Sequence, residues 1–381
     1  MECSNDKKIK NGFTTGSCAA AATKAALMML ISGKKINEIK IITPSSDIYS
    51  PQICNAAIAK LYKGKLSIGD YASASVIKES GDDPDITNSL EIVSFVTFVE
   101  GQRRITIKGG EGVGKVTRPG LDQPVGEYAI NSTPRKMITE VVEELLENND
   151  IDYGVEVTIS VPKGCEIAEK TFNPHMGIEG GISIIGTTGI VKPMSTEALV
   201  ETIKLDINMQ YSEGKKTCII VPGNYGVTFL TNKMNVSDKD IVLCSNFAGD
   251  SVKMAVDAGF RKILFCSHIG KMIKVSGGVL NTHSMYGDRR MEFMVDAFVE
   301  AVNNNQGKIE NTRVTEIKNR IMECVSTTAA LDVISEIDFV KEVSSVIVNR
   351  TVGHLSDACD NKAEINVILY ENNYGELARS F

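Results

Sequence analysis

The most informative stretch of the chain, residues 217–268, reads TCIIVPGNYGVTFLTNKMNVSDKDIVLCSNFAGDSVKMAVDAGFRKILFCSH. Three short apolar runs alternate in it with two helix-like segments. The runs are residues 217–221, 241–244 and 262–266, and the helix-like segments are 226–234 and 247–258. This alternation is typical of a parallel sheet whose strands are joined by crossover helices. The stretch therefore predicts an α/β architecture for the second half of the chain.

The pattern extends beyond this stretch on both sides. An apolar run at 181–185 and a helix-like segment at 195–212 precede it, and another helix-like segment follows at 269–277. The remainder is mostly helical, with one last strand expected at 364–370. We predict an α/β Rossmann-like cofactor-binding domain over residues 179–381, with a mainly parallel sheet that begins at 181–185 and a helical C-terminal part.

The first half has a different rhythm. Ala-rich and Leu-rich sequence at 17–31 favours a helix, and Thr and Ser residues before it can cap its start. A second helix is expected at 134–148. Strands are expected at 38–43, 73–78, 91–99, 103–108 and 154–161, and the Gly-rich segment 109–126 reads as a long ordered loop. We predict an α+β substrate-binding domain over residues 1–178.

Composition and charge exclude several classes of protein. Of the 381 residues, 43% are hydrophobic and 23% charged, which is ordinary globular usage. The net charge is −7 and Lys and Arg form no long run, which argues against nucleic acid as a partner. The apolar stretch 18–31 is interrupted by Thr23 and Lys24 and is shorter than the ~20 residues that a bilayer requires. Without a secretory signal pattern, we expect a cytoplasmic protein that does not bind membranes.

The cysteines and histidines do not form a metal-binding pattern. The nine cysteines are scattered without a CxxC pair, so neither a disulfide framework nor a thiolate zinc site is indicated. Cys218, Cys244 and Cys266 lie in apolar runs and are expected to be buried, reduced thiols. The four histidines show no metal-ligand spacing, so we expect no protein-bound metal.

Small polar residues follow the predicted strands of the second half. Ligands of an open parallel sheet bind outside the carboxyl ends of its strands, where Gly, Asn, Ser and Thr leave room for a nucleotide-like ligand. The alternative is that tight turns and helix caps alone require these residues. The expected cofactor-binding residues are Gly186, Thr187, Thr188, Gly189, Gly223, Asn224, Tyr225, Gly226 and Asn246.

The segment GGEGVGKV at residues 109–116 comes close to a phosphate-binding P-loop. Val116 lacks the hydroxyl that would bind magnesium, and the Pro-Gly pair at 119–120 cannot open the required helix. Lys108, Lys115 and Arg118 could instead bind carboxylates of a substrate. The alternative is a solvated loop with ordinary surface charge.

His268 is the best-placed candidate for acid–base chemistry, because it directly follows an apolar strand. We pair it with Asp250, which also follows a strand of the same predicted sheet. Asp250 could instead simply occupy the first turn of a helix, where negative charge is favoured. His283 lies in a Gly-rich loop that could border the same crevice, and we include it among the expected substrate-binding residues.

Seven blocks of sequence, in order along nearly the whole chain, resemble the cobalt-precorrin-5B C(1)-methyltransferase family (CbiD). The blocks are GFTTGSCAAA at 12–21, residues 107–120, VGEYAINSTPR at 125–135, GGISIIGTTGIVKPMS at 180–195, GNYG at 223–226, SNFAGD at 245–250 and HIGKMIK at 268–274. One departure is Tyr128, where the family pattern has Pro. The first block contains Thr14 and Thr15, which we add to the expected substrate-binding residues.

The resemblance implies an enzyme of anaerobic cobalamin biosynthesis. Such an enzyme transfers a methyl group from S-adenosyl-L-methionine to carbon 1 of the corrinoid ring and forms cobalt-precorrin-6A. Methyl transfer from a sulfonium depends mainly on positioning and desolvation, so a dedicated nucleophile or metal is not required. The expected partner is an anionic tetrapyrrole. A homo-oligomer and hand-over of product to other enzymes of the corrin pathway remain open.

Two other functions remain open from the residues themselves. A non-catalytic carrier or scaffold could bind an anionic tetrapyrrole and pass it on, although several nucleotide-friendly turns favour an enzyme over a single-ligand carrier. An NAD-dependent dehydrogenase could use the same sheet. Against it, no acidic residue ends the run at 217–221, where a ribose partner would normally lie.

Overall fold

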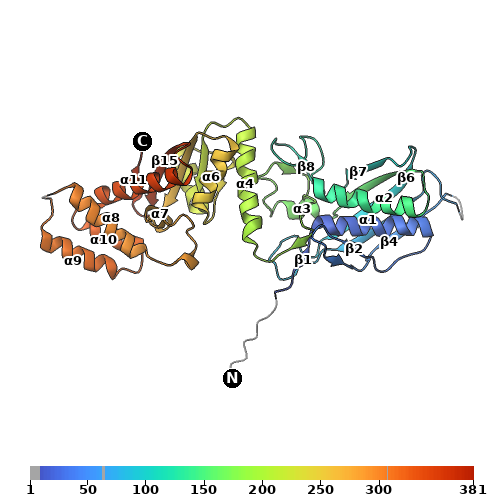
Figure 1. Cartoon of the computed structure of the whole chain (residues 1–381), viewed down its shortest axis with the longest axis horizontal. Helices are drawn as coiled ribbons and strands as arrows, with labels where there is room; N and C mark the ends of the chain where they lie inside the picture. The colour runs from blue at the N-terminus through green and yellow to red at the C-terminus, as the bar shows by residue number, and fades with distance from the viewer. Residues whose placement is uncertain (1–8, 62–64, 307) are drawn as a thin grey trace, which may run out of the picture. The chain divides into compact units, whose positions relative to one another are not determined.

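The structure is a computed structural model that describes residues 9–61, 65–306 and 308–381. It is mixed α/β and divides into two compact units, Met1–Thr196 (unit 1) and Glu197–Phe381 (unit 2), shown in blue to green and in yellow-green to red in Figure 1. The boundary expected at 178/179 differs from this division, because residues 179–196 belong to unit 1.

Unit 1 contains a five-stranded sheet with the strand order β4-β5-β6-β9-β7. All its pairs are antiparallel except β7 with β9, which is parallel. Two helices, α1 and α2, pack against each other, and α1 lies on β5 and β6 (Figure 1). The elements are β4 (Ala56–Ala59), β5 (Tyr71–Ile77), β6 (Glu91–Val99), β7 (Ile105–Gly109), β9 (Gly154–Ser160), α1 (Thr15–Ser32), α2 (Ser132–Asn148) and α3 (Gly164–Ala168), with a small hairpin of β2 (Ile41–Ile42) and β3 (Ile48–Tyr49).

Helix α1 is the central element of unit 1. Thr14 caps its start by accepting a hydrogen bond from the Ser17 N–H, and Gly33 ends it in the left-handed conformation at φ 70°. By length and composition α1 could cross a bilayer, but 78% of its residues are buried inside the unit. Burial of small Ala side chains on every side lets α1 approach both the sheet and α2 closely.

The apolar run at 181–185 does not begin the parallel sheet, so that prediction is wrong. Ile182 and Ile184 instead make single bridges to Val113 and Ile130 in unit 1 and are buried in its core. The chain on either side also pairs within unit 1, since β10 pairs with β8 and β11 with β1. These short strands are β1 (Gly12–Phe13), β8 (Lys115–Val116), β10 (Ile178–Glu179) and β11 (Ile190–Val191).

Unit 2 contains a second five-stranded sheet, with the order β13-β12-β14-β15-β16. The first four strands are parallel, as the alternating pattern predicts, and β16 is an antiparallel edge strand that the sequence did not indicate. The strands are β12 (Cys218–Val221), β13 (Ile241–Leu243), β14 (Lys262–His268), β15 (Glu364–Glu371) and β16 (Gly375–Arg379).

Helices cover both faces of this sheet. Cys218 and Ile220 join the large core cluster that also contains buried residues of α6, α7 and α11. Val221 faces the opposite side, where it packs with Leu230 of α5. The helices are α4 (Thr196–Ser212), α5 (Asn224–Met234), α6 (Ala248–Ala258), α7 (Ile269–Ser276), α8 (Arg290–Asn304), α9 (Asn311–Met322), α10 (Thr327–Ser335) and α11 (Val340–Ala358), with short 3-10 turns η1 (Asp238–Asp240) and η2 (Ser284–Tyr286).

Candidate functional site

The strand order of unit 2 reverses beside β12. The chain runs from β12 through α5 to β13 on one side, and from β13 through α6 to β14 on the other side of β12. In an open α/β sheet such a reversal opens a crevice at the carboxyl ends of the strands, where ligands bind. The turns that follow β12, β13, β14 and β15 are therefore the candidate functional site of unit 2, and are called the strand-end site here.

Two glycines after β12 have different roles. A Cβ at Gly226 would lie 2.8 Å from the Val221 Cβ, so this glycine allows α5 to pack closely on its own strand. Gly223 has extended backbone, and a Cβ there would meet no atom within 4 Å. Asn224 and Tyr225 begin α5 and are exposed. The turn after β12 thus presents open space and exposed polar groups at the strand-end site.

The turn after β13 is tied to a distant loop. Asn246 accepts hydrogen bonds from Thr282 through its backbone oxygen at 2.9 Å and through its side-chain Oδ1 at 3.1 Å. This brings the loop that carries His283 to the same edge of the sheet, as the sequence suggested. His283 is exposed, and its Nδ1 accepts a hydrogen bond from the Met285 N–H at 3.2 Å.

His268 ends β14 and caps the helix that follows it. Its Nδ1 accepts the Gly270 N–H at 3.1 Å, which makes the ring the N-cap of α7. Its Nε2 lies 3.8 Å from Oε1 of Glu371, the last residue of β15. Burial lowers the pKa of His268 below its usual value, and the Glu371 carboxylate opposes that shift. The ring is therefore neutral at pH 7, with its proton on Nε2 because Nδ1 already accepts a hydrogen bond.

The carboxylate partner of His268 is Glu371 rather than the predicted Asp250. Asp250 is exposed in the first turn of α6, and no hydrogen bond or ion pair joins it to His268 in the described part of the chain. Glu371 is 3% exposed and accepts hydrogen bonds from Thr328 and from the backbone N–H groups of Asn373 and Tyr374. Burial alone would raise the pKa of Glu371, but these hydrogen bonds outweigh it and lower the pKa.

Sequence reasoning missed Glu371 because it considered only the turns after the apolar runs 181–185, 217–221, 241–244 and 262–266, and not the turn after the last run at 364–370. The signal was present, since an acidic residue ends the last apolar run of the chain. Lys271 was also missed as a site residue. It lies in the first turn of α7, and its Nζ donates hydrogen bonds to the carbonyl oxygens of Pro222 and Ser245, at the ends of β12 and β13.

The predicted cofactor residues 186–189 lie in unit 1 and do not belong to the strand-end site. A Cβ at Gly186, whose φ is 137°, would lie 2.2 Å from the Thr14 Oγ1. A Cβ at Gly189 would lie 2.7 Å from the Thr43 Cβ. The two glycines allow this segment to pack against the start of α1, whereas Thr187 and Thr188 between them are exposed.

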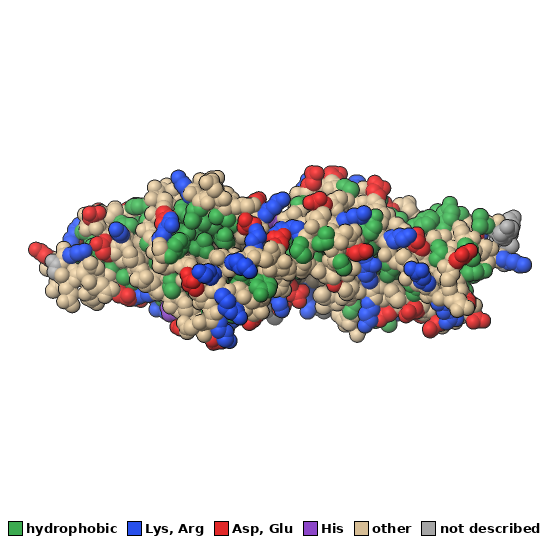
Figure 2. All heavy atoms as spheres, turned by 90° about the horizontal axis from the view of Figure 1, so that it is seen from above, with side chains coloured by type: hydrophobic (Ala, Val, Ile, Leu, Met, Phe, Trp, Pro, Cys, Tyr) green, Lys and Arg blue, Asp and Glu red, His purple; other side chains and the backbone are tan. Residues whose placement is uncertain are grey.

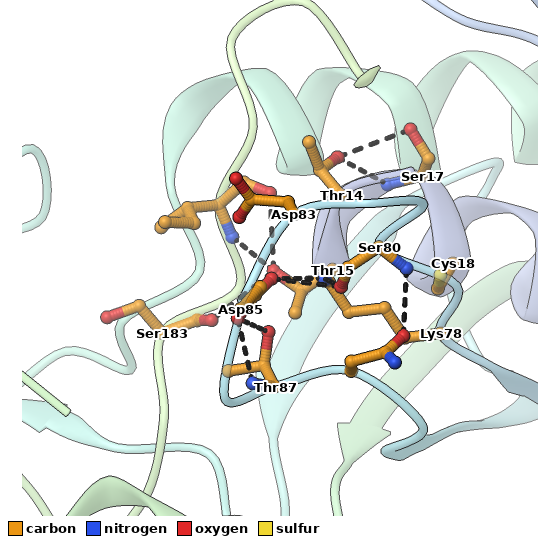
Figure 3. A network of polar contacts seen from close by, with 12 residues as sticks. Thr14, Thr15, Ser17, Cys18, Lys78, Ser80, Asp83, Asp85, Thr87 and Ser183 are labelled. Carbon is orange, nitrogen blue, oxygen red and sulfur yellow. Dashed lines mark hydrogen bonds and ion pairs between the residues drawn. The ribbon is translucent and has the colours of Figure 1, made fainter. Parts of the chain in front are cut away.

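The start of α1 is a dense polar network (Figure 3). Thr15 Oγ1 donates to the carbonyl oxygens of Ser183 and Ile185 and accepts the Ile185 N–H at 2.9 Å. Ser17 Oγ donates to the Gly189 carbonyl oxygen at 2.6 Å. The side chains of Thr14 and Thr15, expected to bind substrate, are therefore both engaged in hydrogen bonds within unit 1.

Figure 3 also shows a buried ion pair beside this network. Lys78 is 2% exposed, and its Nζ contacts the Asp85 carboxylate and the Ser80 hydroxyl. Asp85 accepts two further hydrogen bonds from Thr87, through its backbone N–H and its hydroxyl. Burial would raise the pKa of Asp85, but the bonds from Lys78 and Thr87 lower it overall. This pair holds the turn that follows β5.

The three cations expected to bind substrate carboxylates differ in their surroundings. Lys108 is exposed and paired with Glu156 at 2.5 Å. Lys115 is exposed and lies 4.9 Å from the centre of the Tyr128 ring, so the residue that departs from the family pattern contacts one of these cations. Arg118 donates to the His175 carbonyl oxygen at 2.6 Å and packs against Gly177. Lys115 is thus the cation best able to contact a ligand.

The glycines of the segment 109–114 pack against backbone and side chains of unit 1. A Cβ at Gly112 would lie 1.9 Å from the Val161 carbonyl oxygen, and one at Gly164 or Gly181 would strike Gly112. A Cβ at Gly109 would lie 2.2 Å from the Tyr128 ring. Close packing therefore explains the glycine content of this segment without an anion.

The thiols predicted to be buried are buried. Cys218, Cys244 and Cys266 all lie in the unit 2 core, and burial raises the pKa of Cys244 and of Cys266 to about 12. Cys18 of α1 is also buried, with a pKa raised by burial to about 11. Thiols of such high pKa carry little thiolate at pH 7, which excludes them as nucleophiles.

Comparison with known proteins adds the family. A family model described as CbiD matches residues 2–193. The chain is 39% identical over 98% of its length to the cobalt-precorrin-5B C(1)-methyltransferase of Alkaliphilus metalliredigens, covering 92% of that protein. It belongs to the CbiD family. The enzyme of the same name from Ruminiclostridium cellulolyticum is 39% identical to this CbiD-family chain, over 98% of the chain and 92% of that enzyme. The enzyme from Methanocaldococcus jannaschii is 40% identical, over 92% of the chain and 91% of that enzyme.

A crystal structure of the cobalamin biosynthesis protein CbiD from Archaeoglobus fulgidus is 24% identical, with a TM-score of 0.38, covering 74% of this chain and 84% of that one. The family model ends at residue 193, close to the end of unit 1, whereas the CbiD relatives also match unit 2. The strand-end site therefore lies in the part of the chain that the relatives cover and the family model does not.

Proposed function

We propose that this protein is a methyltransferase of cobalamin biosynthesis that uses S-adenosyl-L-methionine to methylate carbon 1 of cobalt-precorrin-5B, giving cobalt-precorrin-6A. The observation that carries the proposal is the identity of 39–40% to enzymes of that name along nearly the whole chain. The cluster of exposed and partly buried polar groups at the strand-end site supports it.

We place the methyl donor at the strand-end site of unit 2, which has the parallel strand order of a Rossmann-like sheet. The turn at Gly223 fits such a ligand, because nothing occupies the space in front of its Cα and the exposed Asn224 and Tyr225 border it. The donor supplies an electrophilic methyl group on a sulfonium. The chain contributes orientation and exclusion of water, which are the main requirements of an in-line methyl transfer. Of the predicted cofactor residues, Gly223, Asn224, Tyr225 and Asn246 remain candidates for direct contact, and Gly226 for packing.

His268 is the residue we assign to the reacting end of this site, as a hydrogen-bond donor through its Nε2–H. Its Nε2–H is not hydrogen-bonded to Glu371 at 3.8 Å, so it is available to a bound ligand. Glu371 acts behind it as a positioning residue, because its carboxylate faces the ring and favours the protonated form. Asp250 has no part in this pair and is assigned only to the first turn of α6.

In unit 1 we assign Lys115 to the carboxylates of the corrinoid, with Lys108 and Arg118 as secondary candidates because each already has a partner. Cobalt-precorrins carry several acetate and propionate arms, and an exposed ammonium group is a suitable partner for them. The proposal includes a cytoplasmic enzyme that does not bind membranes or nucleic acid. A protein-bound metal is not part of it, and in the described residues no three His, Cys, Asp or Glu side chains form a group that could hold one.

The proposal is tested by a calorimetric titration of the full chain with S-adenosylmethionine, S-adenosylhomocysteine, NAD and ATP, followed by incubation with cobalt-precorrin-5B. We expect binding of the first two ligands and one methyl group transferred per corrinoid. Binding of NAD alone would favour a dehydrogenase. Binding of the corrinoid without any of the four ligands would favour a carrier.

A further inference from the structure

The strand-end site contains two lysines, one of which, Lys274, acts on Asp288 through its charge. Within the described part of unit 2, neither Lys271 nor Lys274 forms an ion pair with a carboxylate. Lys271 is partly buried and donates to the carbonyl oxygens of Pro222 and Ser245 at 3.2 and 3.1 Å. Lys274, one turn further along α7, is 7% exposed and donates to the Thr282 carbonyl oxygen at 3.2 Å. Most buried or partly buried ammonium groups in proteins have a counter-charge.

The positions of these lysines coincide with the reversal of strand order. Pro222 and Ser245 follow β12 and β13, and Lys271 itself follows β14, so its ammonium group spans the carboxyl ends of three parallel strands. An ammonium group has three N–H donors, and the two carbonyls use two of them. One donor and the full positive charge remain at the crevice where a ligand of this sheet would bind.

We propose that Lys271 binds a carboxylate of a ligand at the strand-end site. This inference rests on the proposed function, which offers two sources of that carboxylate: the amino-acid end of S-adenosylmethionine and the acid arms of the corrinoid. Lys274 adds positive charge one turn away without contacting the ligand itself. The open space in front of Gly223 provides room beside Lys271, and no side chain caps the start of α5 in the described chain.

Further observations agree with an anionic ligand. Burial lowers the pKa of Lys271, Cys244 opposes this shift, the charge of Lys274 adds to it, and no carboxylate contributes. A bound carboxylate would compensate both lowering effects. A charge-assisted hydrogen bond in such a desolvated position is about twice as strong as a neutral one. The donor carboxylate is the source we expect, because the sulfonium ligand and Lys271 are assigned to the same strand ends.

The test compares Lys271→Gln and Lys271→Arg with the native protein in titrations of the full chain. Gln keeps N–H donors for the two carbonyls but removes the charge, whereas Arg keeps the charge. Lys233→Met, an exposed lysine in the last turn of α5, is the matched control. The probes are S-adenosylhomocysteine and methylthioadenosine, which share the adenosine and the sulfur but differ in the amino-acid carboxylate. The corrinoid substrate is the third probe.

We expect Lys271→Gln to weaken S-adenosylhomocysteine binding at least about tenfold. Methylthioadenosine should bind unchanged, Lys271→Arg should stay within about threefold of the native affinity, and Lys233→Met should have no effect. Weakened binding of the corrinoid alone would keep the carboxylate site and assign it to the substrate. Equal losses for all three probes, or no loss for any, would overturn the inference.

If the proposed function is wrong, the titrations of the native chain give a different result. If the native chain binds neither S-adenosylhomocysteine nor methylthioadenosine, the assignment of the donor is wrong. The carboxylate site is then judged from the corrinoid titration, in which an unchanged affinity of Lys271→Gln rejects it. Thermal unfolding of each variant, expected within a few degrees of the native protein, checks that affinity changes do not reflect misfolding.

Discussion

His268 has ring nitrogens with unequal surroundings. Nδ1 accepts the Gly270 N–H, so the neutral ring carries its proton on Nε2 and can offer a ligand a hydrogen bond from that N–H. Removing the ring therefore removes a helix cap together with the candidate hydrogen-bond donor. A useful variant must separate the two roles, and Asn does so because it is a good N-cap residue that does not titrate.

We predict that His268→Asn lowers kcat about 100-fold, the effect of removing one hydrogen-bond donor from a reaction site, while the Kd for the methyl donor stays unchanged. In the native enzyme kcat should fall as the pH drops through the pKa of His268, which burial holds below its usual 6.5, because protonation at Nδ1 breaks the hydrogen bond from Gly270 that orients the ring. This limb of the pH profile should disappear in the variant. Near-normal turnover of His268→Asn would assign the ring to capping alone.

Gly186 in unit 1 and Gly223 in unit 2 lie in turns that differ in backbone conformation and in surroundings. Gly186 has φ 137° and lies against Thr14 at the start of α1, whereas Gly223 is extended and faces open space. Val at position 186 therefore tests packing within unit 1, whereas Val at position 223 tests ligand binding at the strand-end site. The sequence suggested one cofactor site for both glycines.

We predict that Gly223→Val leaves the melting temperature nearly unchanged and weakens donor binding at least tenfold, because its side chain enters the space that the ligand needs. Gly186→Val should lower the free energy of unfolding by about 2 kcal/mol or more through overpacking and a disfavoured backbone angle, without changing donor affinity in the folded fraction. Thermal unfolding and titration of both variants measure the effects. Loss of donor affinity in a fully folded Gly186→Val would return residues 186–189 to the cofactor site.

The turn after β5 depends on one buried ion pair. We predict that Lys78→Met lowers the free energy of unfolding by about 3 kcal/mol, because Asp85 then loses its counter-charge in a largely buried position. Lys10→Met removes a pair with Glu79 whose side chains are both 71% exposed, and it should cost less than about 1 kcal/mol. Denaturant unfolding compares the two variants. Similar losses of unfolding free energy in the two variants would show that burial does not make the Lys78–Asp85 pair more important for stability.

The same pair has a pH dependence whose direction follows from Asp85. Its pKa is lower in the folded chain than its ordinary 3.8, so its contribution to stability is fully present above that value and is lost as the pH falls through the folded pKa. Lys78→Met should therefore be less sensitive to acid below pH 4 than the native protein. An unaltered acid sensitivity would contradict this assignment.

The negative net charge of the whole molecule repels an anionic substrate, whereas individual lysines attract it. The chain carries −7, and on the face seen in Figure 2 basic and acidic side chains are interspersed. At physiological ionic strength exposed charges are screened beyond about 8 Å, so individual cations near the bound substrate matter more than the net charge. An acidic protein can thus bind a polycarboxylate through a few well-placed lysines.

We predict that Lys115→Glu raises the KM for the corrinoid about fivefold or more and reduces the dependence of KM on salt, because one favourable charge pair is replaced by repulsion. Lys136→Glu, which changes an exposed lysine of α2, is the control and should leave KM unchanged. Steady-state kinetics at two salt concentrations measure both. Equal effects of the two variants would indicate a response to net charge only.

Local patterns in the sequence determined most of the elements and the parallel sheet. Most helices and strands lie close to their expected residues, because periodicity, glycine turns and capping are properties of short segments. These elements are the helices α1 and α2, the strands β5, β6, β9, β12, β13, β14 and β15, and the crossover helices of the parallel sheet. The family was also recognisable, because it rests on blocks of consecutive residues.

Only the tertiary structure decided where distant segments meet. An alternating apolar run such as 181–185 is compatible with either sheet, and its pairing with Val113 and Ile130 depends on chain far away in sequence. For the same reason Glu371, from the last parallel strand, replaces Asp250 as the partner of His268, and Lys271 spans the ends of three strands. Periodicity shows which face of a segment is buried, but the partner of a side chain is set by the order of strands in the folded sheet.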